Sequence, residues 1–310
     1  MNGKPSGAHY VKGCEVIVNT THMTMGLLVL VFSSAGAEQR TAQRPIQLEA
    51  ADCSRMRMSF GRDQVAYAVQ RQVVPLSTAT LNVRPGGHGG VRIDRGSGDS
   101  YSITACIGVG ADTREEAQQL ADAVRLSVEG NQVGVEGFAQ TRHGGVQLIV
   151  EAPPNARIDV ETVNGPIVVD GFDGQLNARA SNGPINLESV AGVVRGVAVN
   201  GPISISGSRG NIDVETQNGP ITVTLDGAEW DGDLQARAKN GPLTVTVPEG
   251  FRSGVEISSS SNSPWNCRIA ACGGTEPPRQ DGARTLRFGA EPVTVKVSTV
   301  NGPVTINRKQ

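Results

Sequence analysis

Hydrophobic and polar residues alternate with a period of two along much of this chain, and the tripeptide Asn-Gly-Pro interrupts the alternation. The tripeptide occurs six times, and the intervals between successive copies are 18, 18, 18, 22 and 61. Alternation of this kind predicts short strands on both sides of each tripeptide. The three equal intervals predict that these strand pairs stack on one another as coils. The repeated asparagines are Asn164, Asn182, Asn200, Asn218, Asn240 and Asn301.

Each Asn-Gly-Pro is predicted to form the bend between the two strands of one coil. Proline fixes its own φ angle and donates no amide, and the residue before a proline is disfavoured in a helix. The parity of the preceding strand places the asparagine inward, where stacked side chains could form an amide ladder. The alternative is that asparagine is used only because it tolerates turn conformations. A second bend is predicted ten residues after the asparagine, at Gly174, Gly192 and Gly210.

These patterns predict an all-β fold, namely a single-chain parallel β-solenoid (a β-helix or β-roll) with about 18 residues per coil. The solenoid is expected over residues 146–310, with an irregular cysteine-containing insertion near residues 259–284. The coil could be a flattened two-sided roll or a three-sided helix, and the spacing alone leaves both open.

Residues 38–145 lack the tripeptide but keep alternating segments, which predicts a strand-rich N-terminal region. One helix is expected at residues 112–125, because Thr113 and Glu116 resemble a capping box and apolar residues follow with helical spacing. The ends of a strand stack must be protected against edge pairing, so this region could be the cap.

Residues 1–37 have the three-part layout of a secretory signal. An apolar run, Met25–Phe32, follows a segment with Lys4 and Lys12 and precedes small residues that end at Ala37, the predicted cleavage point. The run is shorter than the roughly 20 residues that a membrane-spanning helix needs. We therefore expect an exported protein, in the periplasm, in the cell envelope or outside the cell, with no integral membrane span after cleavage.

Four cysteines remain after that cleavage, and an even number in an exported chain predicts disulfides. Four cysteines allow three connectivities. The preferred pairing is Cys267 with Cys272, which are close enough to close a small loop, and Cys53 with Cys106. A metal site at Cys267 and Cys272 lacks further ligands, because the remaining histidines stand far away in glycine-rich segments. We therefore predict no metal and no cofactor.

Charge and composition narrow the function classes. The 28 Lys and Arg residues nearly balance the 30 Asp and Glu residues, and a formal net charge of -2 does not favour nucleic-acid binding. The chain has only four His, three Tyr and two Trp residues. It contains no phosphate-loop lysine motif, no Gly-x-Ser-x-Gly and no His-Glu-x-x-His. No catalytic and no cofactor-binding residue is therefore assigned.

Three features together resemble one known family: the signal segment, the helix segment Thr113-Arg114-Glu115-Glu116-Ala117, and coils such as Asp159-Val160-Glu161-Thr162-Val163-Asn164-Gly165-Pro166-Ile167. They are similar to the bacterial DUF4097 family, whose members carry the name "putative adhesin". The resemblance spans roughly residues 60–308. It implies a single-chain β-helix at the cell envelope with an adhesive or structural role, and it implies no catalytic residue. The insertion that holds Cys267 and Cys272 departs from the family pattern.

The sequence therefore predicts a non-enzymatic structural or adhesive module, exported to the bacterial cell envelope, with a glycan or a protein as partner. A repetitive surface can bind many weak sites at once.

Two other functions stay open. A carbohydrate-active β-helix enzyme would group carboxylates on an outer face, and the candidates are Asp170, Asp173, Glu188, Asp226, Glu229, Asp231 and Asp233. A flat array of hydroxyls could order water and bind ice, although threonine is also a favoured strand residue. The residues that would form the array are Ser204, Ser206, Thr222, Thr224, Thr244 and Thr246.

The loop that lengthens the fourth interval contains Trp230 and Asp231. An aromatic ring flanked by acids could be a contact site for a sugar or a protein. The alternative is that Trp230 packs over the end of a coil.

Overall fold

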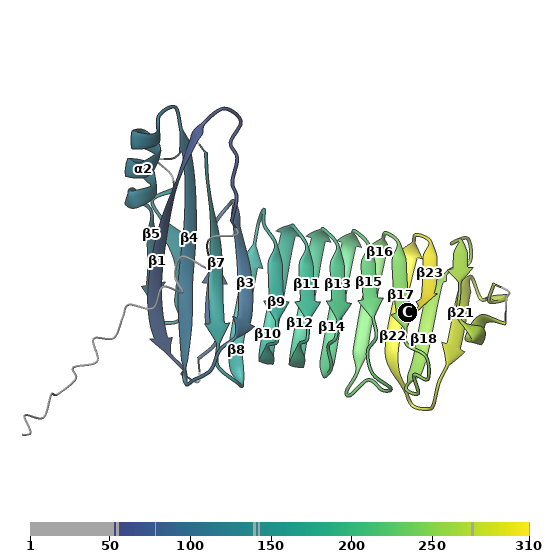
Figure 1. The fold of residues 1–310 in the computed structure, drawn as a ribbon. Coiled ribbons are helices and arrows are strands. Elements are labelled where there is room, and N and C mark those ends of the chain that lie inside the picture. The colour runs from purple at the N-terminus through teal and green to yellow at the C-terminus, as the bar shows by residue number, and fades with distance from the viewer. Residues whose placement is uncertain are drawn as a thin grey trace, which may run out of the picture. The chain divides into compact units, whose positions relative to one another are not determined.

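The computed structural model describes residue 53 and residues 56–77, 79–138, 141, 143–273 and 276–309. All of them belong to one compact unit, Pro45–Gln310. The segment predicted to be a signal, residues 1–37, lies outside the described residues. The described part is dominated by strands, with the α-helix α2 (Arg114–Ala123) and the short 3-10 helix η2 (Ala270–Cys272) (Figure 1).

The strands form two sheets. Sheet A has eleven strands in the order β1 (Gln64–Pro75), β4 (Ser100–Ala111), β7 (His143–Ala152), β3 (Gly89–Arg95), β9 (Ile167–Asp170), β11 (Ile185–Glu188), β13 (Ile203–Ser206), β15 (Ile221–Thr224), β17 (Leu243–Val247), β23 (Val304–Arg308) and β19 (Trp265–Cys267). Sheet B has twelve strands in the order β20 (Arg279–Gln280), β21 (Ala283–Phe288), β18 (Gly254–Ser260), β22 (Val293–Asn301), β16 (Leu234–Asn240), β14 (Asn211–Asn218), β12 (Ala191–Asn200), β10 (Asp173–Asn182), β8 (Ala156–Thr162), β2 (Leu81–Arg84), β6 (Gln132–Glu136) and β5 (Arg125–Glu129).

The prediction of an all-β fold agrees with these sheets, but the prediction of a parallel β-solenoid is wrong, because both sheets are mixed. At the N-terminal end β1 pairs antiparallel with β4, β4 with β7, and β5 with β6. At the C-terminal end β21 pairs antiparallel with β18 and β20. Two of these reversals have a local cause: two-residue loops join β5 to β6 and β20 to β21, and such tight loops can only connect antiparallel strands.

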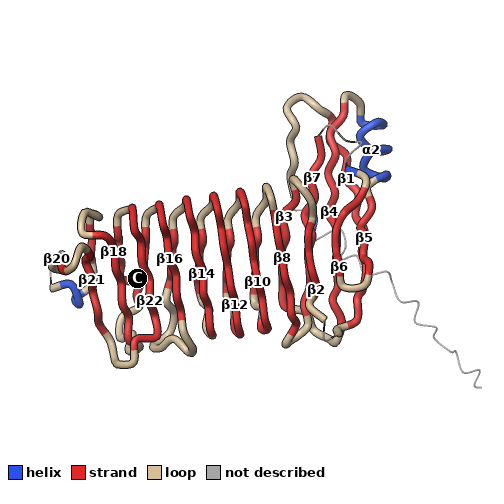
Figure 2. The backbone as a smooth tube through the Cα atoms, turned by 180° about the vertical axis from the view of Figure 1, so that it is seen from behind, coloured by secondary structure: helices blue, strands red, loops and turns tan. Residues whose placement is uncertain are grey.

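Between these ends, in the repeat stack (residues 156–247), neighbouring strands pair in parallel at matching positions. Figure 2 shows the sheet B strands β8, β10, β12, β14 and β16 side by side. In sheet B Leu176 lies opposite Ile158 on one side and Val194 on the other, and in sheet A Ile185 lies opposite Ile167 and Ile203. These apolar side chains are at most 2% exposed. Because each buried aliphatic side chain stabilises a fold by about 1.5–3 kcal/mol before entropy is subtracted, this interior column holds the two sheets together.

The glycine of Asn-Gly-Pro is required by a close approach between coils. A Cβ atom at Gly183 would lie 2.2 Å from the carbonyl oxygen of Gly165, and one at Gly201 would lie 2.0 Å from that of Gly183. The second bend adds a conformational requirement, because Gly192 and Gly210 have φ angles of 94° and 97°. Gly174 does not share this φ angle, but a Cβ atom there would lie 2.4 Å from the carbonyl oxygen of Ala156, so a close approach requires glycine at this bend too.

The longest interval, between Asn240 and Asn301, contains a coil that is placed out of sequence order. Strand β18 pairs with β22, and β19 pairs with β23, so residues 254–267 lie beyond the strands that follow them in the chain. In this coil Asn262-Ser263-Pro264 takes the place of the tripeptide, because Trp265 lies opposite Val304. The amide of Val304 donates to the carbonyl of Pro264 at 2.9 Å.

The helix α2 lies within the predicted range 112–125 and packs against β1 and β4. The Thr113 side chain accepts a hydrogen bond from the amide of Glu116 at 3.2 Å, which caps the first turn. Ala117 and Ala121 are the buried residues of the helix. Their small side chains let the helix lie close to the strands.

Candidate functional site

The repeated asparagines form a continuous ladder of side-chain hydrogen bonds. In each step the Nδ2 atom of one asparagine donates to the Oδ1 atom of the asparagine in the preceding coil, at distances of 3.1, 3.0, 3.0, 3.0 and 2.9 Å. The first asparagine, Asn164, donates to the carbonyl of Gly87 at 2.9 Å. The ladder therefore continues from the repeat stack into the N-terminal region.

The predicted inward position of these asparagines is wrong, since all six are exposed. The alternation of buried and exposed residues fails next to the bend: in several coils the residue before the asparagine is exposed too, as at Val199 and Asn200. Extending the alternation of the strand as far as the bend therefore placed the asparagines on the interior side, whereas they lie on the surface. The side-chain bonds lie on the surface, where water competes for them.

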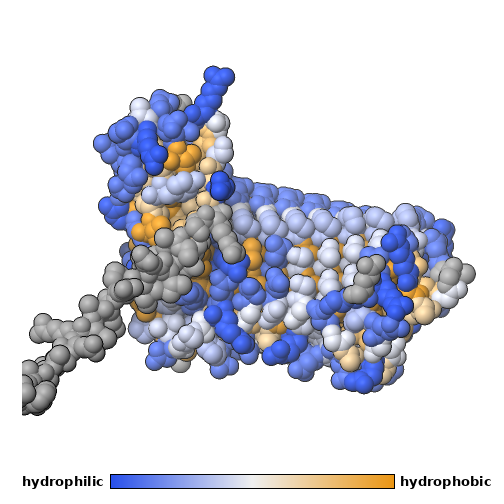
Figure 3. Space-filling view, viewed as in Figure 1, coloured by the Kyte–Doolittle hydropathy of each residue, from blue (hydrophilic) through white to orange (hydrophobic). Residues whose placement is uncertain are grey.

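Serine and threonine cover the outer side of sheet A over four consecutive coils. We call this surface the hydroxyl face, and its residues are Ser204, Ser206, Thr222, Thr224, Thr244, Thr246 and Thr305. All seven are half-buried, and pale, weakly polar residues run along the stack in Figure 3. Thr305 was missed by sequence reasoning, although it stands at the same distance after its asparagine as Thr244 and Thr222 do.

The hydroxyl face ends where charged residues replace the hydroxyls. In the two preceding coils Asp170 lies opposite Glu188. Arg92 binds Asp94 at 2.8 Å and Asp170 at 3.3 Å. The pKa of Arg92 is raised, chiefly by the hydrogen bond to Asp94, with further contributions from the charges of Asp94, Asp170 and Glu188, against an opposing effect of burial. Asp173 begins β10 elsewhere, at the second bend.

The carboxylates near the long loop are also engaged by surface groups. Glu229 accepts from Arg252 at 2.9 Å. Asp226 accepts from the amide of Gly207 at 2.6 Å and forms an ion pair with Lys309. Four of the candidates lie in the one loop between β15 and β16, whereas Asp170, Asp173 and Glu188 belong to β9, β10 and β11. Asp170, Asp226 and Glu229 form ion pairs with Arg92, Lys309 and Arg252.

The ring of Trp230 is 6% exposed and belongs to the hydrophobic core. Its Nε1 atom donates to the carbonyl of Gly210 at 3.1 Å, and its amide donates to the Ser253 hydroxyl at 2.9 Å. These contacts correspond to a tryptophan that packs over a coil. Asp231 beside it is exposed.

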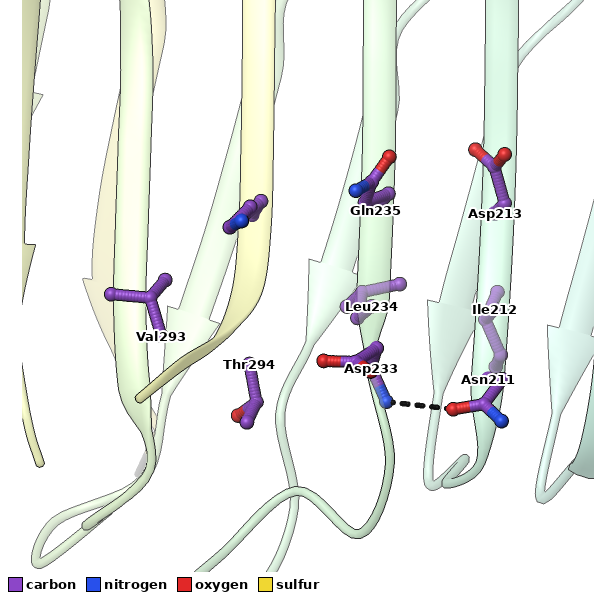
Figure 4. Close-up of a pocket in the computed structure, with 9 residues that line it drawn as sticks. Asn211, Ile212, Asp213, Asp233, Leu234, Gln235, Val293 and Thr294 are labelled. Carbon is purple, nitrogen blue, oxygen red and sulfur yellow. Dashed lines mark hydrogen bonds between the residues drawn. The ribbon is translucent and has the colours of Figure 1, made fainter. Parts of the chain in front are cut away.

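A shallow cavity of about 400 Å³ lies on sheet B where β14, β16 and β22 begin (Figure 4). Figure 4 shows Asp213 and Gln235 on neighbouring strands, and the amide of Asp233 donates to the Asn211 side chain at 3.1 Å. Arg237 binds Asp213 at 2.6 Å. The remaining lining residues are Ile212, Leu234, Val293, Thr294 and Lys296. The lining offers two carboxylates, one hydroxyl and one amine, and contains no imidazole and no thiol.

The four cysteines of the described part form two disulfides, Cys53–Cys106 and Cys267–Cys272, which is the preferred pairing. Within the residues that the structure describes, no three His, Cys, Asp or Glu side chains are grouped so that they could hold a metal ion. The same part of the chain contains no helix with the length and apolar character needed to cross a membrane.

The fold and its surface define the class of protein only broadly, as an all-β protein of two mixed sheets with a repetitive outer surface. No protein-family model matches the chain, and no curated protein matches it. The resemblance to DUF4097 therefore stays a prediction.

Several solved structures are similar to this chain. A "putative cell adhesion protein" from Clostridium sporogenes is 9% identical, with 79% of this chain and 100% of that chain covered and a TM-score of 0.31. A "putative adhesin" from Bacteroides fragilis is 12% identical, with 78% and 97% covered and a TM-score of 0.38. A "putative lipid binding protein" from Parabacteroides distasonis is 11% identical, with 78% and 97% covered and a TM-score of 0.31.

Proposed function

We propose that this chain is a non-enzymatic adhesive or structural module of the bacterial cell envelope, and that it binds an envelope glycan through the hydroxyl face. The observation that carries the proposal is the chemical uniformity of this face. Along one row, Ser204, Thr222, Thr244 and Thr305 face one another on successive strands. Each position offers a hydroxyl and none offers a charge.

Rows of hydroxyls suit a polymer that itself consists of repeated hydroxyl-bearing units. Each serine or threonine hydroxyl can donate one hydrogen bond and accept others. A single such bond contributes only about 0.5–1.5 kcal/mol. Because the rows repeat at the strand spacing of about 4.8 Å, one polymer can make many of these contacts together, and avidity then replaces a deep pocket.

The outer side of sheet B supports this choice of surface by contrast. Its long charged side chains pair with one another, as Arg179 does with Asp159 at 3.2 Å and Arg237 with Asp213 at 2.6 Å. Each such exposed ion pair contributes at most about 1 kcal/mol to stability. The charged side chains nevertheless occupy the outer side of sheet B, which therefore suits an uncharged polymer less well than the hydroxyl face does. The hydroxyl face of sheet A presents short side chains instead.

Export to an oxidising compartment is supported by the two disulfides. We expect thiol labelling of the protein in intact cells to find the four cysteines unreactive until a reductant is added. Labelling of all four without reductant would place the protein in a reducing compartment.

Binding to purified peptidoglycan sacculi and to a panel of soluble envelope polysaccharides tests the proposal. Thr222→Lys/Thr244→Lys places two long cations on the hydroxyl face, so we expect apparent affinity to fall at least tenfold. Gln175→Lys/Gln217→Lys adds the same charge at exposed positions on the outer side of sheet B and should change the affinity less than twofold.

Equal losses in the two double variants would contradict the assignment to the hydroxyl face. Enrichment no greater than that of an unrelated β protein would contradict glycan binding altogether. Release of new reducing ends that disappears with Asp231→Ala would replace the proposal by an enzymatic function.

A further inference from the structure

The two sheets have four outer edges, and three of them are short or covered. The C-terminal edges are β19, with three residues, and β20, with two. At the N-terminal edge of sheet B, the side chain of Gln70 binds the backbone of β5 and of the residue before it: it donates to the carbonyl of Val124 at 2.6 Å and accepts from the amide of Leu126 at 2.8 Å. Gln72 donates to the carbonyl of Leu126 at 3.2 Å. Short or covered edges resist pairing with another chain.

The fourth edge, β1, is neither short nor, among the described residues, covered by another strand. It is twelve residues long, and among the described residues only β4 pairs with its backbone. Its outward side chains include Tyr67, Val69 and Val73, which are 43%, 42% and 64% exposed. Figure 3 shows hydrophobic residues on the surface of these N-terminal strands. The one charged side chain of β1, Arg71, turns back to Ser102 and to Glu151, at 2.7 and 3.2 Å.

We propose that β1 pairs antiparallel with β1 of a second copy of this chain, about a two-fold axis at Val69. In this register Val69 faces its own copy, Val65 faces Val73, and Tyr67 faces Arg71. Valine pairs are favourable on one face of an antiparallel pair, and Tyr67 lies opposite an Arg71 whose guanidinium stays turned toward Ser102 and Glu151. On the other face Ala68 lies opposite Gln70, so no like charges meet.

The sequence of β1 is therefore complementary to itself, which is what a two-fold symmetric interface requires. A register centred on Arg71 would place the two Arg71 residues at facing positions, where only the contacts to Ser102 and Glu151 keep the like charges apart. The register centred on Val69 avoids this placement. The dimer joins two eleven-stranded sheets into one and exists whether or not the hydroxyl face binds a glycan.

The first measurement is the molar mass of the full chain over a range of concentrations, by sedimentation equilibrium. We expect a reversible dimer. Val73→Lys should raise its dissociation constant at least tenfold, because two-fold symmetry introduces the cation twice. Val193→Lys is the matched control: Val193 is 51% exposed on β12, far along sheet B, and this variant should dissociate as the unchanged chain does.

Charge pairing tests the register. Val65→Glu/Val73→Lys places opposite charges at facing positions, so we expect dimerisation to return to within threefold of the unchanged chain. Val65→Lys/Val73→Lys changes the same two positions with like charges and should stay at least tenfold weaker. Thermal unfolding followed by circular dichroism identifies any variant that has lost its fold.

Hydrogen exchange gives a readout that needs no variant. The outward amides of β1 should become protected as the concentration rises, while those of β12 should not change. A chain that is monomeric at all concentrations overturns the proposal, as does a dimer that Val73→Lys leaves intact. Amides of β1 that are protected equally at every concentration would mean that the chain covers this edge with its own residues, and that also overturns it.

Discussion

The repeat stack and the N-terminal strands (residues 64–152) contribute to the same two sheets but are specified in different ways. In the stack each strand repeats its neighbour's pattern, so that Leu176, Val194 and Ile212 occupy one row of the interior. In the N-terminal strands β1, β4 and β7 run in alternating directions, and no position repeats. The stack can therefore grow by adding coils, whereas the N-terminal strands form a single arrangement that depends on particular long-range contacts.

The surfaces of the two regions differ in the same way. The stack exposes amides, hydroxyls, paired charges and single valines such as Val193, and its asparagine ladder binds each coil to the one before it. The N-terminal strands instead place three exposed side chains, Tyr67, Val69 and Val73, on one long edge strand, which only β4 pairs with among the described residues. The region that ends a stack must stop further strand pairing or direct it to one chosen partner. At β5, glutamine side chains stop further strand pairing. At β1, we propose that pairing is directed to a second copy of the chain.

The largest loss of stability is expected when the disulfide of the N-terminal region, which has no repeated coils, is removed. Cys53→Ser/Cys106→Ala opens a link across 53 residues in the N-terminal region, and we expect the free energy of unfolding to fall by about 4 kcal/mol. Cys267→Ser/Cys272→Ala opens a link across only 5 residues in the last coil and should cost about 2 kcal/mol. Chain entropy lost in the unfolded state grows with the length of the closed loop, which is the reason for the difference. Urea unfolding measures both values, and a larger loss for the second pair would show that the last coil depends more on its link than the N-terminal region does.

A backbone contact within the stack comes next. Gly201→Ala would place a methyl group 2.0 Å from the carbonyl oxygen of Gly183, so neighbouring coils must move apart, and we expect a loss of about 3 kcal/mol. The matched change in the other region is Gly98→Ala, in an exposed bend where a Cβ would meet nothing within 4 Å. That variant should be neutral or slightly more stable, since alanine restricts the unfolded chain. If Gly201→Ala unfolds at the same urea concentration as the unchanged chain, the coils are less tightly stacked than the structure indicates.

Much of the stack could be predicted from the sequence because every coil repeats the same requirement. The regular spacing of the tripeptide predicted which residues face one another, and Asn182 does lie opposite Asn200. The bends were predicted from Gly and Pro, although the close approach between Gly201 and Gly183 could be recognised only in the structure. The alternation of buried and exposed residues did not reveal that the asparagines point outward, because it breaks at the bend.

The two ends could not be predicted, because their pairings occur once. The antiparallel partners of β1 and β4 share no repeated residue that would have revealed them. The alternation of residues 254–258 indicated an irregular coil, but nothing in the sequence indicated that residues 254–267 lie beyond β22. The partners of the candidate carboxylates could not be predicted either, because they come from distant parts of the chain. Asp170 was a candidate acid in the sequence, and in the fold Arg92 binds it.

The smallest effect concerns the ladder that connects the two regions. Asn200→Ala removes one bond that Asn200 donates to Asn182 and one that it accepts from Asn218. Because both groups are exposed and water replaces the lost partners, we expect a loss of only about 1 kcal/mol. Asn177→Ala, at an exposed position on β10 outside the ladder, is the control and should change the stability by less than about 0.5 kcal/mol. If thermal unfolding of the two variants coincides, the ladder adds no stability, and asparagine stands at the bend only for the backbone conformations that it tolerates.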